Sequence, residues 1–164
     1  MKSINFKAIY PHLIAVAVFL IVAVIYCKPA LEGKVLQQSD VTQWKAMYED
    51  QRKVKEETGT LPLWTNGMFS GMPGYQIAIE GYNPLSIGYV FQLLTLSLPK
   101  PFYFFLLASI CFYLLTQIMR INPYLGIFGG LSYAFATYHP ILISAGHETK
   151  MIALGYLPAF IGGL

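Results

Sequence analysis

Hydrophobic and polar positions in this chain are separated into long blocks. An apolar stretch from about residue 9 to 26 has the roughly 17–25 residues that a membrane-spanning helix needs. A second stretch covers 102 to 119, and a third, from 124 to 138, begins only a few residues later. We predict three spans, the last two forming an antiparallel hairpin whose tight turn carries Arg120.

A fourth apolar segment begins near Met151 and runs to Leu164. Its fourteen residues are too few to cross about 30 Å of hydrocarbon at 1.5 Å per residue, so we expect the N-terminal part of a longer polytopic protein. The first stretch ends in Ile25-Tyr26-Cys27, which does not fit a small-residue cleavage site. It is therefore expected to be an uncleaved anchor.

Basic residues near the predicted spans suggest an orientation. Lys2 and Lys7 precede the first span, and Arg120 lies in the predicted hairpin turn. Because cytoplasmic flanks are enriched in Lys and Arg, we expect the N-terminus and this turn to be cytoplasmic. Residues 27–101 then form a large extracytoplasmic loop.

The first part of this loop has a helical pattern. Apolar residues lie there at separations of three, four and seven, as on one face of a helix, namely Val41, Trp44, Met47, Tyr48 and Val54. Asp40 with Gln43 resembles the start of a capping box, and Gly59 followed by Pro62 marks an end. The pattern predicts an amphipathic helix over 41–58.

The rest of the loop has two further parts. Residues 61–84 combine glycines and prolines with aromatic residues such as Trp64. Such a loop either approaches a ligand closely or lies among the lipid headgroups. Residues 85–98 are apolar but too short to span, which predicts a juxtamembrane or re-entrant helix.

Composition agrees with this segregation. Hydrophobic residues make up 55% of the 164 and charged residues 12%, against about 45–50% and about 25% in soluble domains. Of the eleven basic and eight acidic residues, twelve fall between Lys28 and Glu57, where Glu49 and Lys53 are spaced as a helical i,i+4 pair. An ordinary soluble globule, a disordered chain, a disulfide scaffold and a nucleic-acid-binding surface are all disfavoured.

Asp40 is the first candidate for chemistry. It lies about thirteen residues after the first predicted span, at the start of the amphipathic helix. A carboxylate there can act as a general base toward an acceptor hydroxyl. The alternative is that Asp40 only caps the helix, a position that Asp favours.

A second candidate is the polar run Gly146-His147-Glu148-Thr149-Lys150 after the third predicted span. His147 and Lys150 would share a helical face and hold a phosphate by charge-assisted hydrogen bonds, and Glu148 is a candidate metal ligand. The alternative is an interfacial polar turn with a snorkelling lysine. The sequence contains no Cys/His metal-ligand spacing, and it does not identify a cofactor.

Three separated stretches, in this order, resemble the start of the YfhO-like bacterial integral membrane proteins. They are Leu31-Glu32-Gly33-Lys34-Val35-Leu36-Gln37-Gln38-Ser39-Asp40, Pro62-Leu63-Trp64-Thr65-Asn66-Gly67-Met68-Phe69-Ser70-Gly71-Met72-Pro73 and Ala145-Gly146-His147-Glu148-Thr149-Lys150. The resemblance covers nearly the whole chain. The family pattern has Asn where Glu148 stands, so no family role is carried over to Glu148.

The resemblance implies an all-α polytopic membrane protein of the GT-C glycosyltransferase type, with a large extracytoplasmic first loop. Such enzymes take a sugar from a polyprenyl-phosphate donor on the outer face of the cytoplasmic membrane, and some relatives decorate envelope glycopolymers. It implies Asp40 as the catalytic acid residue. Trp64, Asn66, His147 and Lys150 are the matching candidates for substrate binding.

A non-catalytic integral membrane protein is the rival hypothesis. In a lipid-handling or transport component, or an inactive fragment, Asp40 would be a cap and the Gly-rich loop a surface anchor. His147 and Lys150 would then form an interfacial pair. Only the resemblance favours the enzyme.

Overall fold

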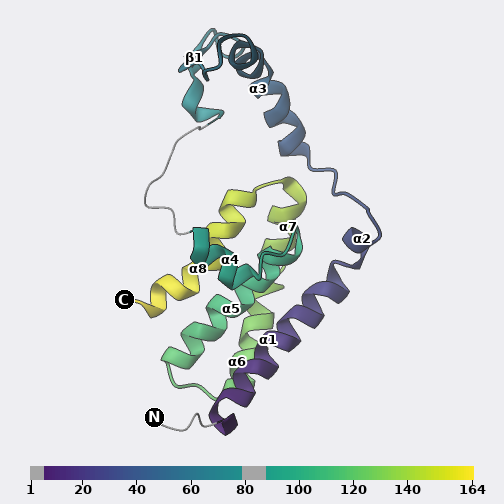
Figure 1. Ribbon diagram of the computed structural model, residues 1–164, viewed down its shortest axis with the longest axis vertical. Helices are drawn as coiled ribbons and strands as arrows, with labels where there is room; N and C mark the ends of the chain where they lie inside the picture. The colour runs from purple at the N-terminus through teal and green to yellow at the C-terminus, as the bar shows by residue number, and fades with distance from the viewer. Residues whose placement is uncertain (1–5, 79–87) are drawn as a thin grey trace. The chain divides into compact units, whose positions relative to one another are not determined.

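The computed structural model describes residues 6–78 and 88–164, which form two compact units (Figure 1). Residues 37–86 make up one unit, and the flanking segments make up the other. Helices dominate the described residues of both, as the predicted all-α class requires. The flanking unit contains α1 (Phe6–Tyr26), α2 (Lys28–Leu31), α4 (Gly88–Thr95), α5 (Phe102–Ile118), α6 (Pro123–Ala134), α7 (Tyr138–Ala145) and α8 (Glu148–Gly162).

Helix α5 is the centre of the flanking unit. It packs against α1, α4, α6 and α8, and its residues 102–109 are all buried. Its connection to α6 is the predicted tight turn, in which Arg120 has a left-handed φ of 57°. Asn122 caps α6 by accepting a hydrogen bond from the backbone N–H of Tyr124 at 2.9 Å, and Pro123 begins the helix.

Small residues allow these helices to approach closely. A Cβ atom on Gly130 of α6 would lie 2.9 Å from the backbone oxygen of Ser109 and 3.0 Å from the Phe19 ring. A Cβ atom on Gly155 of α8 would lie 2.9 Å from Leu107. Close backbone approach at small residues is typical of helix packing in membranes.

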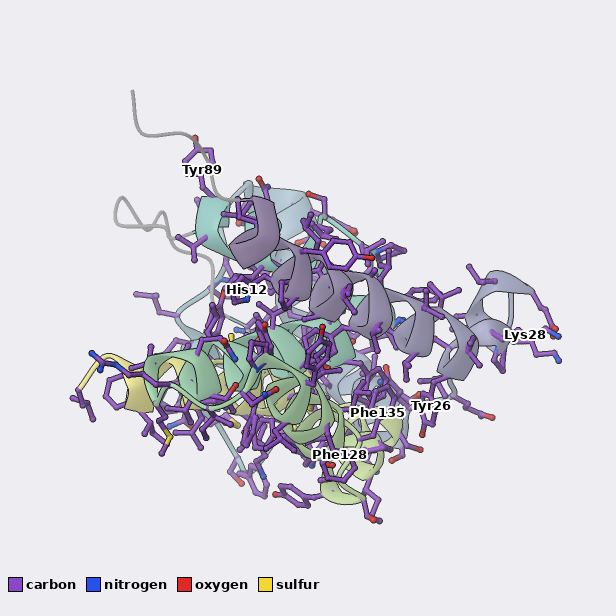
Figure 2. All side chains as sticks on the ribbon, turned by 90° about the horizontal axis from the view of Figure 1, so that it is seen from below. His12, Tyr26, Lys28, Tyr89, Phe128 and Phe135 are labelled. Carbon is purple, nitrogen blue, oxygen red and sulfur yellow. The ribbon has the colours of Figure 1, made fainter. Side chains whose placement is uncertain are left out.

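Aromatic side chains join three segments of the same unit. The rings of Tyr26 and Phe135 lie side by side in Figure 2, with centroids 5.0 Å apart, and Phe105 of α5 stacks on Phe135 at 4.7 Å. A polar contact lies further along α1, where His12 Nδ1 is 2.7 Å from the Tyr113 hydroxyl. This contact gives the His12 ring a polar partner on a largely apolar helix.

The third apolar segment is interrupted. Helix α6 ends at Ala134 and α7 begins at Tyr138, so the segment predicted as one span to residue 138 contains a break. Pro140 gives the reason, since it has no N–H to donate and its ring would clash with the carbonyl of residue 136 in a continuous helix. The fourth apolar segment is α8, which begins at Glu148, three residues before the predicted start.

By length and composition, α1 is the one helix among the described residues that can cross a membrane. Only 17% of its 18-residue apolar window, Ile9–Tyr26, is buried within the chain. A core helix of a soluble protein or a signal sequence passes the same test. Helix α5 is apolar but shorter, at 17 residues.

The unit formed by residues 37–86 is built on α3 (Ser39–Thr58). This helix confirms the predicted amphipathic segment, and Gly59 ends it with a φ of 75°, as its position before Pro62 indicated. A short antiparallel pair follows, β1 (Trp64–Thr65) with β2 (Met72–Pro73), and then a 3₁₀ helix, η1 (Gly74–Gln76). Of the predicted helix over 85–98, the described part contains α4, and residues 85–87 lie outside the described residues.

Candidate functional site

Asp40 lies in the first turn of α3 and does not cap it. The N-cap is Gln38, whose backbone is extended and whose carbonyl accepts the first helical hydrogen bond, from the N–H of Thr42 at 3.1 Å. The predicted capping start at Asp40 is therefore wrong, because Ser39 already has helical geometry. Ser39 Oγ donates to Asp40 Oδ1 at 3.2 Å. A carboxylate in the first turn also interacts favourably with the helix dipole.

Trp64 and Asn66, two of the predicted binding residues, lie together on the β1 side of the same unit. Trp64 Nε1 donates to Asn66 Oδ1 at 3.0 Å. The indole also lies directly against Gly71, where a Cβ atom would be 2.8 Å from Nε1. Gly71 has a φ of 118°, which favours glycine. The short strand pair therefore fixes the ring, which is 54% exposed.

These two residues line a half-open hollow of about 230 Å³ between α3 and the strand pair. Its other walls are formed by Asp50, Gln51, Val54, Pro62 and Thr65. Asp50 and Gln51 come from the middle of α3. The hollow thus combines an exposed indole, a carboxylate and two amides.

Gln51 also belongs to this site, although the sequence analysis did not name it as a candidate. It is fully buried, and its Nε2 donates to the carbonyl of Pro62 at 3.3 Å, while its Oε1 has no hydrogen-bond partner in the described structure. The signal was present, since Gln51 lies three residues after Tyr48 and three before Val54, on the predicted apolar stripe. A glutamine on such a stripe is buried, and a buried amide needs partners.

A charged cluster also lies on α3, formed by residues that do not line the hollow. Arg52 binds Glu49 with its Nε at 2.9 Å and its Nη2 at 2.6 Å, and it also pairs with Glu56. The hydrogen bond from Arg52 lowers the pKa of Glu49, and the charges of Arg52 and Lys53 act in the same direction. Glu49 is therefore hydrogen-bonded to Arg52, three residues later. Lys53, the predicted partner four residues later, lowers the pKa of Glu49 only through its charge.

The other two predicted binding residues lie in the flanking unit, at the start of α8. His147 occupies the N-cap position of α8, without a capping hydrogen bond from its side chain, and Lys150 lies in the first turn. Both are exposed, as binding of an external phosphate would require. Glu148 pairs with Lys100, so a structural ion pair accounts for this carboxylate.

The structure therefore gathers only part of the predicted site. Trp64 and Asn66 share the hollow, whereas Asp40 lies ten residues before Asp50 on α3, about 15 Å along the helix axis. His147 and Lys150 belong to the other unit. Within residues 6–78 and 88–164, no three His, Cys, Asp or Glu side chains are grouped to hold a metal ion.

Comparison with known proteins adds no assignment. The chain matches no protein-family model, no curated protein and no solved structure.

Proposed function

We propose that this chain is the N-terminal part of a YfhO-like membrane glycosyltransferase of the GT-C type. It moves a sugar from a polyprenyl-phosphate donor to an envelope glycopolymer on the outer face of the bacterial cytoplasmic membrane. In this proposal α1 and the apolar helices of the flanking unit span the membrane in several passes, with the N-terminus in the cytoplasm. The unit of residues 37–86 lies outside.

One observation carries the proposal. Asp40 lies in the first turn of an amphipathic helix, α3, which comes between the apolar helices α1 and α5 in the sequence. Since Gln38 is the N-cap, capping does not explain the aspartate at position 40. An acidic residue at the head of a surface helix is suitably placed to act on a substrate carried by a membrane lipid.

The chemistry is a single displacement at the anomeric carbon. The acceptor hydroxyl oxygen forms the new bond to that carbon while the bond to the phosphate oxygen breaks, and the bonding electrons leave with the polyprenyl phosphate. Asp40 takes the proton from the hydroxyl. The resemblance gives His147 and Lys150 the task of stabilising the negative charge on the departing phosphate.

The Asp40→Asn variant tests this role in the natural full-length protein. The substitution preserves side-chain size and removes the proton acceptor, so transfer should fall by roughly 10²–10⁴-fold. Stability should fall by no more than about 1 kcal/mol, the usual value of a carboxylate near a helix N-terminus. The assay follows labelled sugar from a polyprenyl-phosphate donor into polymer.

Glu57→Gln is the matched control, because it removes an exposed carboxylate at the other end of α3. It should leave transfer unchanged. Full transfer by Asp40→Asn would exclude Asp40 as the base and favour the non-catalytic alternative.

A further inference from the structure

The hollow between α3 and the strand pair has an acceptor-rich wall. The carboxylate of Asp50 lines it, and so does Gln51, whose buried Oε1 lacks a partner among the described residues. The hydrogen bond from Gln51 Nε2 to Pro62 fixes which end of the amide is left unpaired. A buried acceptor without a partner costs free energy that a donor from a ligand would recover.

A second wall is flat and apolar. The Trp64 indole is about half exposed, and it is held by its hydrogen bond to Asn66 and by its contact with Gly71. A fixed aromatic face binds a ligand at low entropic cost. The hollow, at about 230 Å³, is smaller than the roughly 300–1,000 Å³ of pockets for drug-sized ligands, so it suits one small ring.

We propose that this hollow binds one sugar ring of a neutral glycan. A pyranose has the two properties that the walls require, since its C–H face packs on an aromatic ring and its hydroxyl groups donate to acceptors. Asp50 and Gln51 accept those hydrogen bonds, and Trp64 packs against the ring.

The inference deepens the proposed function and rests on it in one respect, the assignment of this sugar to the acceptor polymer. Asp40 lies about 15 Å away along α3, so the hollow positions a part of the polymer that is remote from the transferred group. Sugar binding itself is measured without transfer. The two proposals can therefore fail separately.

The indole N–H resonances give a direct test in the intact chain in detergent micelles. The chain has two tryptophans, Trp64 in the hollow and Trp44 on α3, whose Nε1 donates to the carbonyl of Ile77 at 2.7 Å. Adding methyl β-D-glucopyranoside or its N-acetylglucosamine counterpart should shift the Trp64 resonance in a saturable manner. The Trp44 resonance should stay in place as an internal control.

Variants identify the acceptors. Asp50→Asn should weaken the binding by at least about tenfold, the usual effect of losing a hydrogen bond to a charged group, and Gln51→Met should weaken it as well. Glu57→Gln, on the same helix outside the hollow, should leave it unchanged. An unmoved Trp44 resonance in each variant shows that the unit remains folded.

Three results would overturn the inference. They are the absence of a Trp64 shift with either glycoside, equal shifts of both tryptophans, and a Trp64 shift with tetramethylammonium but not with the glycosides. A saturable Trp64 shift together with absent transfer would support the hollow and count against the proposed function.

Discussion

Gly130 provides the sharpest test of the helix packing. It lies on α6 where that helix meets both α5 and α1, and an added Cβ would be 2.9 Å from the backbone oxygen of Ser109 and 3.0 Å from Phe19. Phe19 is buried, so its ring has little room to move, and a backbone oxygen in the middle of a helix has less. A larger side chain therefore has to push the helices apart.

The magnitudes decide which substitution to use. Overpacking costs about 1–3 kcal/mol, whereas replacing a helical glycine with alanine gains up to about 1 kcal/mol of helix propensity. Gly130→Ala would thus be ambiguous. Gly130→Val keeps the clash, adds two methyl groups and gains less propensity, which leaves a net loss of about 2 kcal/mol.

The assay is thermal unfolding of the chain in detergent, followed by far-UV circular dichroism. A loss of about 2 kcal/mol corresponds to a melting temperature about 4–8 °C lower for a chain of this size. Gly163→Val is the matched control, because its Cβ would meet nothing closer than 3.5 Å. An unchanged melting temperature for Gly130→Val would refute the close approach of α6 to α5.

Two further predictions concern charge and exposure. The hydrogen bond from Arg52 lowers the pKa of Glu49 in the folded chain. The stability that this bond adds is therefore fully present above the unfolded pKa of Glu49, about 4.3, and it is lost as the pH falls through the lower folded pKa. Glu49→Gln should therefore lower the melting temperature at neutral pH, with a difference from wild type that disappears in acid; a constant difference would argue against the ion pair. In intact cells, a membrane-impermeant maleimide should label Lys53→Cys. Cys27 should react slowly near neutral pH, because burial raises the pKa of its thiol to about 11. Protection of Lys53→Cys would reverse the proposed orientation.

Much of the local structure followed from short sequence signals. The apolar spacing and Gly59 located α3, and the apolar run from 124 located α6 to within one residue of its observed start at Pro123. Each signal acts through the backbone of its own segment, so no distant contact is needed to interpret it.

The features that the sequence did not predict depend mostly on contacts between segments that are distant in the chain. Gln51 and Trp64 line the same hollow although they are thirteen residues apart, and the sequence pattern does not indicate this. The predicted start at Asp40 was wrong because Gln38 is the N-cap and Ser39 is already helical, and only the backbone of the folded chain shows this. Within the third apolar segment, the helix break followed from Pro140, which the apolar pattern alone does not register.

We propose that this chain belongs to an enzyme of envelope glycan synthesis in which Asp40 is the general base. The test measures the sugar composition of envelope polymers in three kinds of cells. One lacks the natural full-length protein, and the other two are the same cells complemented with the wild-type or the Asp40→Asn protein. If Asp40 is the general base, one sugar substituent disappears in the deletion strain and returns with wild type. It stays absent with Asp40→Asn, although the variant is present in the membrane at normal level. Identical polymer composition in all the strains, or full restoration by Asp40→Asn, would contradict it.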